Sequence, residues 1–341
     1  MKASTYIIAE LSANHGQDLD IALASVRAAK AAGADAIKIQ TYTADTITLD
    51  CDSKDFQVKS GTIWDGMTLY QLYQQAYTPW EWHQAIFDEA KNVGIECFST
   101  PFDKSAVDFL ETLGNPIYKI ASFEITDIPL IEYAASKQKP MIISTGVATL
   151  EDIQLAIDTC HKVGNNDITL LHCVSAYPAP LDDVNLLTMK DMGKRYGVKV
   201  GLSDHTLGSD VAIASAALGA SVIEKHFILD RSIGGPDAAF SMQQDEFFSM
   251  VQSIRNVEKA LGIVKYKDDS SQIPGREFSR SLYVAEDINE GEMVTEKNVR
   301  PVRPGYGLHP KYYNEILGKK VRVKLKKGDR VTLYNIFEHD V

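Results

Sequence analysis

Two hydrophobic patterns alternate along the first three quarters of the chain. Short runs rich in valine and isoleucine, typical of buried strands, precede stretches in which apolar residues recur every three or four positions, as in amphipathic helices. The expected strands are 6–11, 35–41, 95–100, 117–122, 140–145, 168–174, 198–203 and 221–227. The expected helices are 19–32, 80–93, 104–113, 129–137, 150–162, 186–196, 210–218 and 245–261. Eight strand–helix units within residues 1–262 predict a (β/α)8 TIM barrel.

A doubly wound open sheet is the alternative fold. That fold would place a glycine-rich phosphate loop after the first strand, and ELSANHG at 10–16 is a poor match. The alternation of strands and helices is interrupted at 42–79 by a long insertion dense in aromatic residues. We expect this insertion to act as a lid or in subunit packing. Thr78, ahead of Pro79, is expected to cap the helix that follows.

The C-terminal part of the chain has a different character. Residues 263–280 are polar and are expected to form a linker. Residues 281–341 contain short β-like runs (SLYVA, KKVRVKL and DRVTLY), turn glycines and many lysines and arginines. This pattern predicts a small separate domain of irregular β structure.

Composition limits the partners and the compartment. The chain has 341 residues, 45% hydrophobic and 24% charged, which suffices for a full-size core. Its net charge of −11 argues against nucleic acid and anionic membranes as partners. Glu10 interrupts the first apolar run, so we expect no signal peptide, and no run approaches membrane-spanning length. The four cysteines lack CxxC spacing, and Cys97 and Cys173 lie in apolar runs, which favours reduced thiols in a cytoplasmic protein.

Two histidines follow neighbouring predicted strands. His205 comes just after one strand and His226 ends the next, and parallel strands place such tips side by side. With Asp204 and Glu224 close by, they favour a divalent-metal site, although two histidines can also be ordinary polar loop residues. Asp204 is either a metal ligand or a residue that orients His205.

Two lysines interrupt apolar strands that end at the same barrel mouth. Lys38 and Lys119 are either structural lysines paired with carboxylates or part of an anion site. The hydroxyl residues Thr100, Ser122 and Ser203 end at the same mouth and favour a cradle for phosphate and carboxylate.

Glu10 and Glu124 are candidate acid–base groups, or structural carboxylates bonded to backbone amides. These residues alone indicate a metal-dependent barrel enzyme that acts on a small phosphorylated anion.

Nine motifs in order resemble the sialic acid synthase family over nearly the whole chain. They are AELSANH (9–15), AGADAIKIQTYT (32–43), STPF (99–102), YKIASFE (118–124), STG (144–146), YP (177–178), GLSDHT (201–206), EKHF (224–227) and RPGYG (303–307). The C-terminal domain at 281–341 resembles the antifreeze-like (SAF) module of that family.

The resemblance implies a reaction and a set of site residues. Members of the family condense phosphoenolpyruvate with an N-acetylated amino sugar, release phosphate and form a nine-carbon α-keto acid. His205 and His226 would then hold Mn²⁺ or Mg²⁺, with Co²⁺ a further candidate, and Glu10 would orient a metal-bound water or move a proton. The residues implied for phosphoenolpyruvate are Lys38, Thr100, Lys119, Ser122 and Ser203. Those implied for the sugar are Gln40, Phe102, Glu124, Ser175, Tyr177, Asp237 and Arg303, the last reaching the partner's site in a domain-swapped homodimer.

Two departures from the family pattern bear on the substrate. Ser175 stands where sialic acid synthases carry asparagine, and the first motif reads AELSANH rather than a version with glycine. Both resemble the pseudaminic acid branch, whose sugar substrate is 2,4-diacetamido-2,4,6-trideoxy-L-altrose. The alternatives are N-acetylmannosamine and the legionaminic acid precursor. A class II aldolase, another phosphoenolpyruvate-condensing barrel and an anionic-sugar binding protein are the competing classes.

Overall fold

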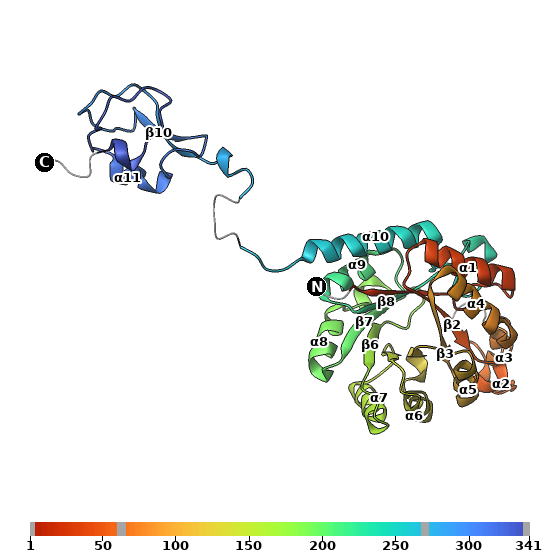
Figure 1. Ribbon diagram of the computed structural model, residues 1–341. Helices are drawn as coiled ribbons and strands as arrows, with labels where there is room; N and C mark the ends of the chain where they lie inside the picture. Colours follow the sequence, from red (N-terminus) through yellow and green to blue (C-terminus); the bar gives the residue numbers. More distant parts are fainter. Residues whose placement is uncertain (1–3, 60–65, 267–272, 337–341) are drawn as a thin grey trace. The chain divides into compact units, whose positions relative to one another are not determined.

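The computed structural model describes residues 4–59, 66–266 and 273–336. The chain divides into two compact units, Met1–Gly262 and Ile263–Val341, drawn from red to cyan and from cyan to blue in Figure 1. The predicted linker at 263–280 falls at the start of the second unit, and its residues 267–272 lie outside the described residues.

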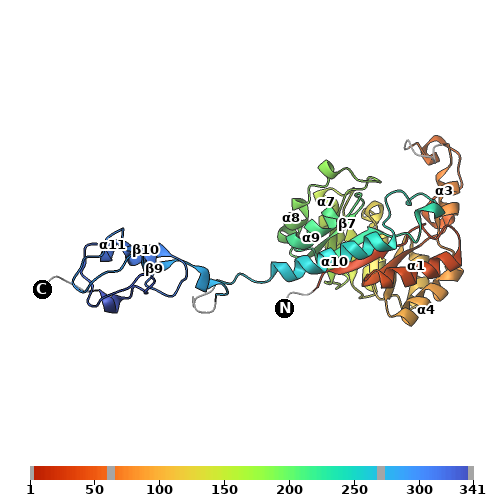
Figure 2. The ribbon, with the colours of Figure 1, turned by 90° about the horizontal axis from the view of Figure 1, so that it is seen from above.

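The first unit is a closed barrel of parallel strands, as predicted. Hydrogen bonding joins the strands in sequence order, and β8 returns to β1. The strands are β1 (Tyr6–Glu10), β2 (Ala36–Thr41), β3 (Glu96–Pro101), β4 (Tyr118–Ile120), β5 (Met141–Ser144), β6 (Ile168–Cys173), β7 (Lys199–Asp204) and β8 (Val222–His226). Figures 1 and 2 show the helices packed around these strands, and α10 running along the outside beside α1 and α9.

The barrel helices lie where the apolar periodicity places them. They are α1 (Leu19–Ala31), α4 (His83–Val93), α5 (Lys104–Thr112), α6 (Ile128–Ser136), α7 (Leu150–Lys162), α8 (Leu187–Tyr196), α9 (Asp210–Leu218) and α10 (Gln244–Leu261). Asp18, Asp103 and Thr149 cap α1, α5 and α7 by accepting hydrogen bonds from backbone amides of the first turn. Short 3₁₀ turns follow β4 (Ser122–Glu124), β6 (Leu181–Asp183) and β8 (Arg231–Ile233).

The insertion after β2 contains short helical segments. These are α2 (Ala44–Ile47), Lys54–Phe56, α3 (Leu69–Ala76) and Trp80–Trp82, and residues 60–65 of the insertion lie outside the described residues.

The prediction that Thr78 caps the next helix is wrong. A 3₁₀ turn intervenes, and α4 begins at His83 without a side-chain cap. The Thr78 hydroxyl instead lies 3.2 Å from Nε2 of His15 in the β1 loop, and His83 Nε2 lies 2.8 Å from the Thr41 hydroxyl. These contacts fasten the end of the insertion to the barrel.

Strand alternation and register build layers inside the barrel. The floor is apolar and is formed by Ile8, Ala36, Phe98, Ile142, Leu171 and Val222. Two residues further along each strand, the inward positions become polar, as at Glu10, Lys38 and Glu224. Gly201 lies near the floor, where a Cβ atom would come within 2.2 Å of the Val222 carbonyl oxygen, so only glycine fits between β7 and β8. The outward positions join two larger clusters with the helices.

The second unit has its own small core. It pairs β9 (Ser281–Val284) with β10 (Val299–Val302) antiparallel, and α11 (Tyr313–Ile316) follows the 3₁₀ turn Pro310–Tyr312. The β-like runs KKVRVKL and DRVTLY form isolated bridges, such as Val321 with Ile336, and a 3₁₀ turn at Leu333–Asn335 rather than further strands. The core residues are Leu282, Val284, Ile288, Val294, Val299, Ile316, Val321, Leu325, Val331 and Ile336.

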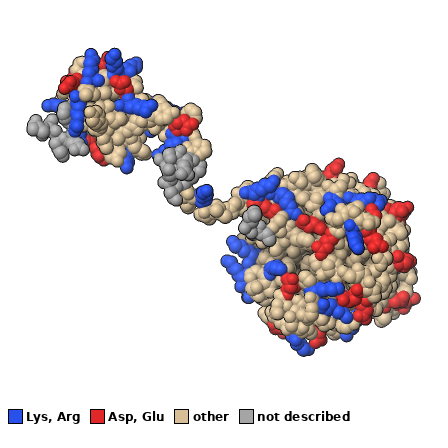
Figure 3. All heavy atoms as spheres, in the orientation of Figure 1, with Lys and Arg blue, Asp and Glu red and all other residues tan. Residues whose placement is uncertain are grey.

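The two units differ in surface charge. Lysine and arginine outnumber aspartate and glutamate in residues 281–341, so the negative excess of the chain lies in the barrel. Figure 3 shows basic side chains spread over the visible side of the second unit with fewer acidic ones among them, and both signs mixed on the barrel. Within the described ranges, no helix has the length and apolarity needed to span a membrane.

Candidate active site

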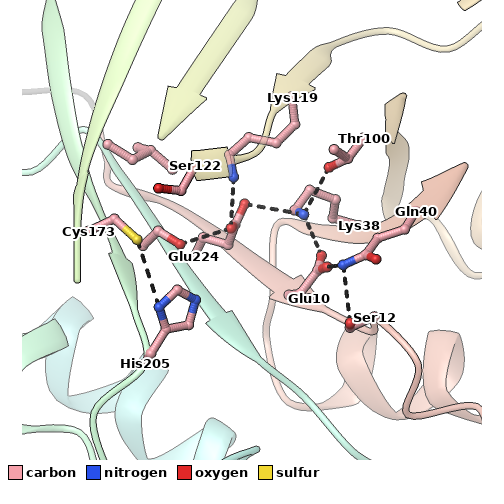
Figure 4. A network of polar contacts seen from close by, with 12 residues as sticks. Glu10, Ser12, Lys38, Gln40, Thr100, Lys119, Ser122, Cys173, His205 and Glu224 are labelled. Carbon is pink, nitrogen blue, oxygen red and sulfur yellow. Dashed lines mark hydrogen bonds and ion pairs between the residues drawn. The ribbon is translucent and has the colours of Figure 1, made fainter. Parts of the chain in front are cut away.

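A cluster of four buried charged residues lies at the mouth end of the barrel interior. Lys38 Nζ lies 2.7 Å from Glu10 Oε2 and 3.7 Å from Glu224 Oε2, and Lys119 Nζ lies 3.0 Å from Glu224 Oε1. Figure 4 shows the four side chains converging from four strands. Each is at most 4% exposed. We call these residues the lumen cluster.

The lumen cluster is paired but incompletely hydrogen-bonded. Oε2 of Glu10 is occupied by the Lys38 ammonium at 2.7 Å, whereas Oε2 of Glu224 has no hydrogen-bond donor within the described part of the chain and only Lys38 at 3.7 Å. Burial raises the pKa of both carboxyls, but Lys119 and Lys38 outweigh it at Glu224 and hold the pKa of that group at about 2. At Glu10 burial prevails over Lys38, and its pKa lies above the ordinary value. The alternative of lysines paired with carboxylates is therefore present together with unused acceptor capacity.

Neutral polar groups surround the lumen cluster. Lys38 donates to the Thr100 hydroxyl at 3.1 Å, and the Ser203 hydroxyl donates to Glu224 at 3.0 Å. Gln40 Nε2 donates to Glu10 at 2.9 Å and to the Ser12 hydroxyl at 3.1 Å. Figure 4 shows the contacts of Lys38 and Gln40, and these hydrogen bonds together hold the carboxylates at the strand ends.

A second pair of hydroxyls stands beside the cluster. The Ser175 hydroxyl donates to that of Ser122 at 2.9 Å, and the backbone amide of Val147 donates to the same Ser122 oxygen at 3.1 Å. Ser122 thereby bridges the ends of β4, β5 and β6.

The two histidines face one another at the same mouth. Their ring centroids lie 5.3 Å apart. His205 Nδ1 lies 3.0 Å from the Val174 carbonyl oxygen, and His226 Nδ1 lies 3.5 Å from Asp237 Oδ2. Burial lowers the pKa of His205 to about 4 and lowers that of His226, so both imidazoles are neutral near pH 7.

The histidine pair fits a shared metal ion. Neutral imidazole is a good ligand for divalent transition ions. His205 Nδ1 contacts the Val174 carbonyl oxygen, which leaves its Nε2 as the ligand atom, whereas His226 Nδ1 has no hydrogen-bond partner in the described residues. With a metal–nitrogen bond of about 2.0–2.1 Å, two imidazoles on one ion have centroids roughly 4.5–5.5 Å apart. The observed spacing lies in that range. In the described residues, no group of three or more His, Cys, Asp or Glu side chains gathers as a metal centre, so protein ligands would come from these two histidines.

The two acidic residues near the histidines form ion pairs with lysines. Asp204 Oδ2 lies 2.8 Å from Lys225 Nζ on the outer face of the strands, which favours the alternative of a residue that orients His205 over that of a metal ligand. Glu224 belongs to the lumen cluster.

Aromatic rings enclose the histidines. Tyr177 lies 4.4 Å from the His205 ring, centroid to centroid, and Phe240 lies 4.9 Å from the His226 ring. Tyr177 is 46% exposed, so its face is open for a bound molecule.

One cavity of about 60 Å³ brings most of the predicted site residues together. It is lined by Glu10, Lys38, Gln40, Lys119, Ala121, Ser122, Ser144, Cys173, Tyr177, Ser203, His205, Glu224 and His226. Thr100, Ser175 and Asp237 contact lining residues directly.

Three other predicted residues stand apart from the lining. The Phe102 and Tyr42 rings pack with their centroids 5.0 Å apart. Burial raises the pKa of Glu124 to about 7, although Lys119 opposes this shift. Arg303 belongs to the second unit.

Several residues at the site had no role assigned from the sequence. Ser144, which lies in the STG motif, and Cys173 occupy inward positions at strand ends, so strand alternation places both in the lining. The Ser144 hydroxyl is buried and has no hydrogen-bond partner in the described residues. Gly146 belongs to the STG motif, but the sequence gave it no role: a Cβ atom there would lie 2.3 Å from the Ser175 hydroxyl and 2.8 Å from that of Ser122. Phe240 lies in the loop after β8 and also had no sequence signal.

Known proteins resemble this chain in sequence and in fold. The profile of the NeuB family matches residues 25–266, and that of the SAF domain matches residues 279–333. The pseudaminic acid synthase of Campylobacter jejuni subsp. jejuni serotype O:2 is 49% identical over 95% of this chain and 94% of its own. That of Helicobacter pylori is 51% identical over 94% of each chain. The crystal structure of N-acetylneuraminic acid (sialic acid) synthetase from Leptospira borgpetersenii serovar Hardjo-bovis has a TM-score of 0.70 and 31% identity, covering 79% of this chain and 89% of that one.

Proposed function

The chain belongs to the NeuB family and carries a SAF domain, and we propose that it condenses phosphoenolpyruvate with 2,4-diacetamido-2,4,6-trideoxy-L-altrose and water to give pseudaminic acid and phosphate. The motif resemblance to sialic acid synthases is confirmed by these matches. Identity of about half to two pseudaminic acid synthases, against 31% to an N-acetylneuraminic acid synthetase, favours this sugar. The observation that carries the proposal is one cavity that joins two buried lysines and two neutral histidines.

Phosphoenolpyruvate is assigned to the lysine side of the cavity. Lys38 and Lys119 supply positive charge in an acidic chain, and their carboxylate partners keep both ammonium groups in place before the anion arrives. The hydroxyls of Thr100, Ser122 and Ser203 add donors for phosphate and carboxylate oxygens.

The sugar is assigned to the outer side, toward the aromatic ring of Tyr177 and the polar groups of Gln40, Ser175 and Asp237. Phe102 and Glu124 would contact its far end. A short hydroxyl at Ser175, already bonded to Ser122, leaves more room than a longer amide would.

The family is metal-dependent, and His205 and His226 would hold the ion. When bound there, Mn²⁺, Mg²⁺ or Co²⁺ supplies a Lewis acid for a carbonyl oxygen. Lys38 contacts Oε2 of Glu10 and Gln40 donates to its Oε1, and the raised pKa of Glu10 suits it to hold a proton or pass it to a water. The lysines stabilise the phosphate that leaves.

Mass analysis of the product from each candidate sugar with phosphoenolpyruvate tests the proposal. The diacetamido altrose should be used with kcat/KM at least ~100-fold above N-acetylmannosamine, because a wrong polar pattern leaves buried groups unpaired. Equal use of both sugars would contradict the substrate. Cleavage without phosphate release would indicate a class II aldolase, and no turnover with any sugar would favour a binding protein.

We also propose that the protein is a domain-swapped homodimer in which Arg303 of one subunit completes the sugar site of the other. The basic second unit and the acidic barrel are complementary in charge. Exposed apolar side chains lie in the segments between β4 and α9, which suits a barrel mouth covered by another part of the protein: Phe123, Val147, Leu150, Leu181 and Leu207.

Subunit exchange tests this arrangement. Arg303→Ala and His205→Ala enzymes should each be nearly inactive, and mixing them should restore about a quarter of wild-type activity, since half of the dimers then hold one intact site. A mixture that stays inactive would show that each SAF domain serves its own barrel.

We further propose that the enzyme works in the cytoplasm. Its four cysteines are free thiols, and Cys97, Cys160 and Cys173 are buried. Free thiols are the rule in reducing compartments, where phosphoenolpyruvate is also made.

A further inference from the structure

A buried ion pair lies on the outer face of β7 and β8, directly behind the two histidines. Asp204 and Lys225 are register partners on these strands, and their side chains are each 1% exposed. Strand alternation turns them away from the lumen, whereas the neighbouring residues His205 and His226 face it. Neither member of the pair lines the catalytic cavity.

Lys225 holds the chain on both sides of His205. Its Nζ donates to Asp204 Oδ2 at 2.8 Å and to the Thr206 carbonyl oxygen at 2.7 Å. Asp204 Oδ1 accepts from the amide of Thr206 at 2.9 Å and from its hydroxyl at 2.7 Å. The residues before and after His205 are thus tied to the side chain that precedes His226.

The energetics of such a pair point away from a purely stabilising role. Desolvation offsets most of the Coulomb attraction in a buried ion pair. Two apolar residues of similar size in its place often stabilise a fold as much or more. An ion pair does, however, hold its two side chains at one distance and in one orientation. Here the contacts of Lys225 join the residues on both sides of His205 to the residue before His226.

We propose that Lys225 and Asp204 are positioning residues of the metal site, which fix the separation of the His205 and His226 rings. The inference rests on the proposed function, because it takes the two histidines as the metal ligands. Partners that orient metal-binding histidines typically change metal affinity by about 10- to 100-fold when altered.

Manganese binding to the full-length protein without substrates tests the proposal. The principal variant is Asp204→Asn/Lys225→Met, which removes both charges and leaves neither buried ion uncompensated. Its Kd for Mn²⁺, from calorimetry or electron paramagnetic resonance, should rise about 10- to 100-fold. Its affinity for phosphoenolpyruvate measured without metal should change less than about twofold, since the lumen cluster is intact.

A matched control removes a different ion pair. Arg255 contacts Asp35 at 2.7 Å at the opposite end of the barrel, and Asp35 also accepts from the Ile7 amide. Asp35→Asn/Arg255→Met should bind Mn²⁺ as the wild type does. Equal weakening in this control would mean that any lost ion pair loosens the metal site.

The outcomes separate this inference from the proposed function. Wild-type Mn²⁺ affinity in Asp204→Asn/Lys225→Met overturns the positioning role. If wild type and His205→Ala bind Mn²⁺ equally, the histidine metal site itself is wrong. Should the double variant not fold, Asp204→Asn replaces it, because asparagine can still accept from Thr206 while losing the charge: a severalfold rise in Kd supports the proposal, and an unchanged Kd refutes it.

Discussion

Two buried charge clusters lie on opposite faces of the same pair of strands, and they are built differently. On the lumen face, Glu224 joins Lys38, Lys119 and Glu10, and one carboxylate oxygen, Oε2 of Glu224, remains without a hydrogen-bond donor in the described residues. On the outer face, both oxygens of Asp204 are hydrogen-bonded and Lys225 has two acceptors. The inner cluster keeps capacity for a ligand, and the outer pair keeps none.

The difference follows from what each cluster faces. An unsatisfied buried polar atom is costly in a packed layer, so the outer pair must be complete. The lumen cluster borders the cavity, where water or a substrate can supply the missing partners. Both faces of these strands carry buried charges, but only the lumen face leaves a buried carboxylate oxygen without a hydrogen-bond donor in the described residues.

Breaking the outer pair from one side should have the largest effect. Lys225→Met leaves the Asp204 carboxylate buried without a countercharge, and the free energy of unfolding should fall by about 3–5 kcal/mol. Urea denaturation at pH 7 measures this. A loss below about 1 kcal/mol would show that the outer pair is not closed to water.

Breaking the lumen cluster should reduce activity more than stability. Lys119→Met should lower kcat/KM for phosphoenolpyruvate by about 100- to 1,000-fold through a raised KM. Its stability should fall less than that of Lys225→Met, since Lys38 remains 3.7 Å from Glu224. Lys139→Met, which removes an ion pair with Glu111 away from the cavity, is the control. An effect on the sugar KM alone would mean that the phosphate lies elsewhere.

The buried histidines His15 and His83 should make the free energy of unfolding fall in acid. Burial lowers the pKa of His15 and of His83 to about 4, against about 6.5 in the unfolded chain. The unfolded state therefore binds more protons as the pH falls below 6.5. Between pH 7 and pH 5 each histidine should cost about 2 kcal/mol of stability, with no contribution above pH 7.

The variant His83→Gln cannot titrate and isolates this contribution. Its stability should depend less on pH than that of the wild type, by about 2 kcal/mol between pH 7 and pH 5. The exposed His161, changed to glutamine, serves as the control for the substitution itself. Identical slopes for wild type and His83→Gln would refute the assignment.

The smallest expected effect comes from filling space beside the lumen cluster. Gly146→Ala places a methyl group against the hydroxyls of Ser175 and Ser122 and should raise substrate KM values about tenfold. Adding Ser175→Ala removes the nearest contact and should recover part of the loss. Steady-state kinetics on the single and double variants measures this, and strictly additive losses would argue against a steric cause.

The sequence by itself determined the barrel and the level at which the chemistry sits. Strand and helix periods are local properties, so eight repeated units are visible without coordinates. Parallel strands then bring their carboxyl ends to one mouth, which is why His205, His226, Lys38 and Lys119 could be placed together from their positions alone. The irregular second unit was less predictable, because isolated bridges have no sequence period.

Only the tertiary structure decided which charge pairs with which. Asp204 and Glu224 are each one or two residues from a histidine, and sequence reasoning grouped both with the metal. Strand alternation and register separate them: Glu224 meets Lys119 in the lumen, and Asp204 meets Lys225 outside. Neither partner is near in sequence, since pairing depends on which strands lie side by side and which face each residue takes. For the same reason the roles of Gly146 and Phe240 could not be predicted, because the residues that they contact are distant in the sequence.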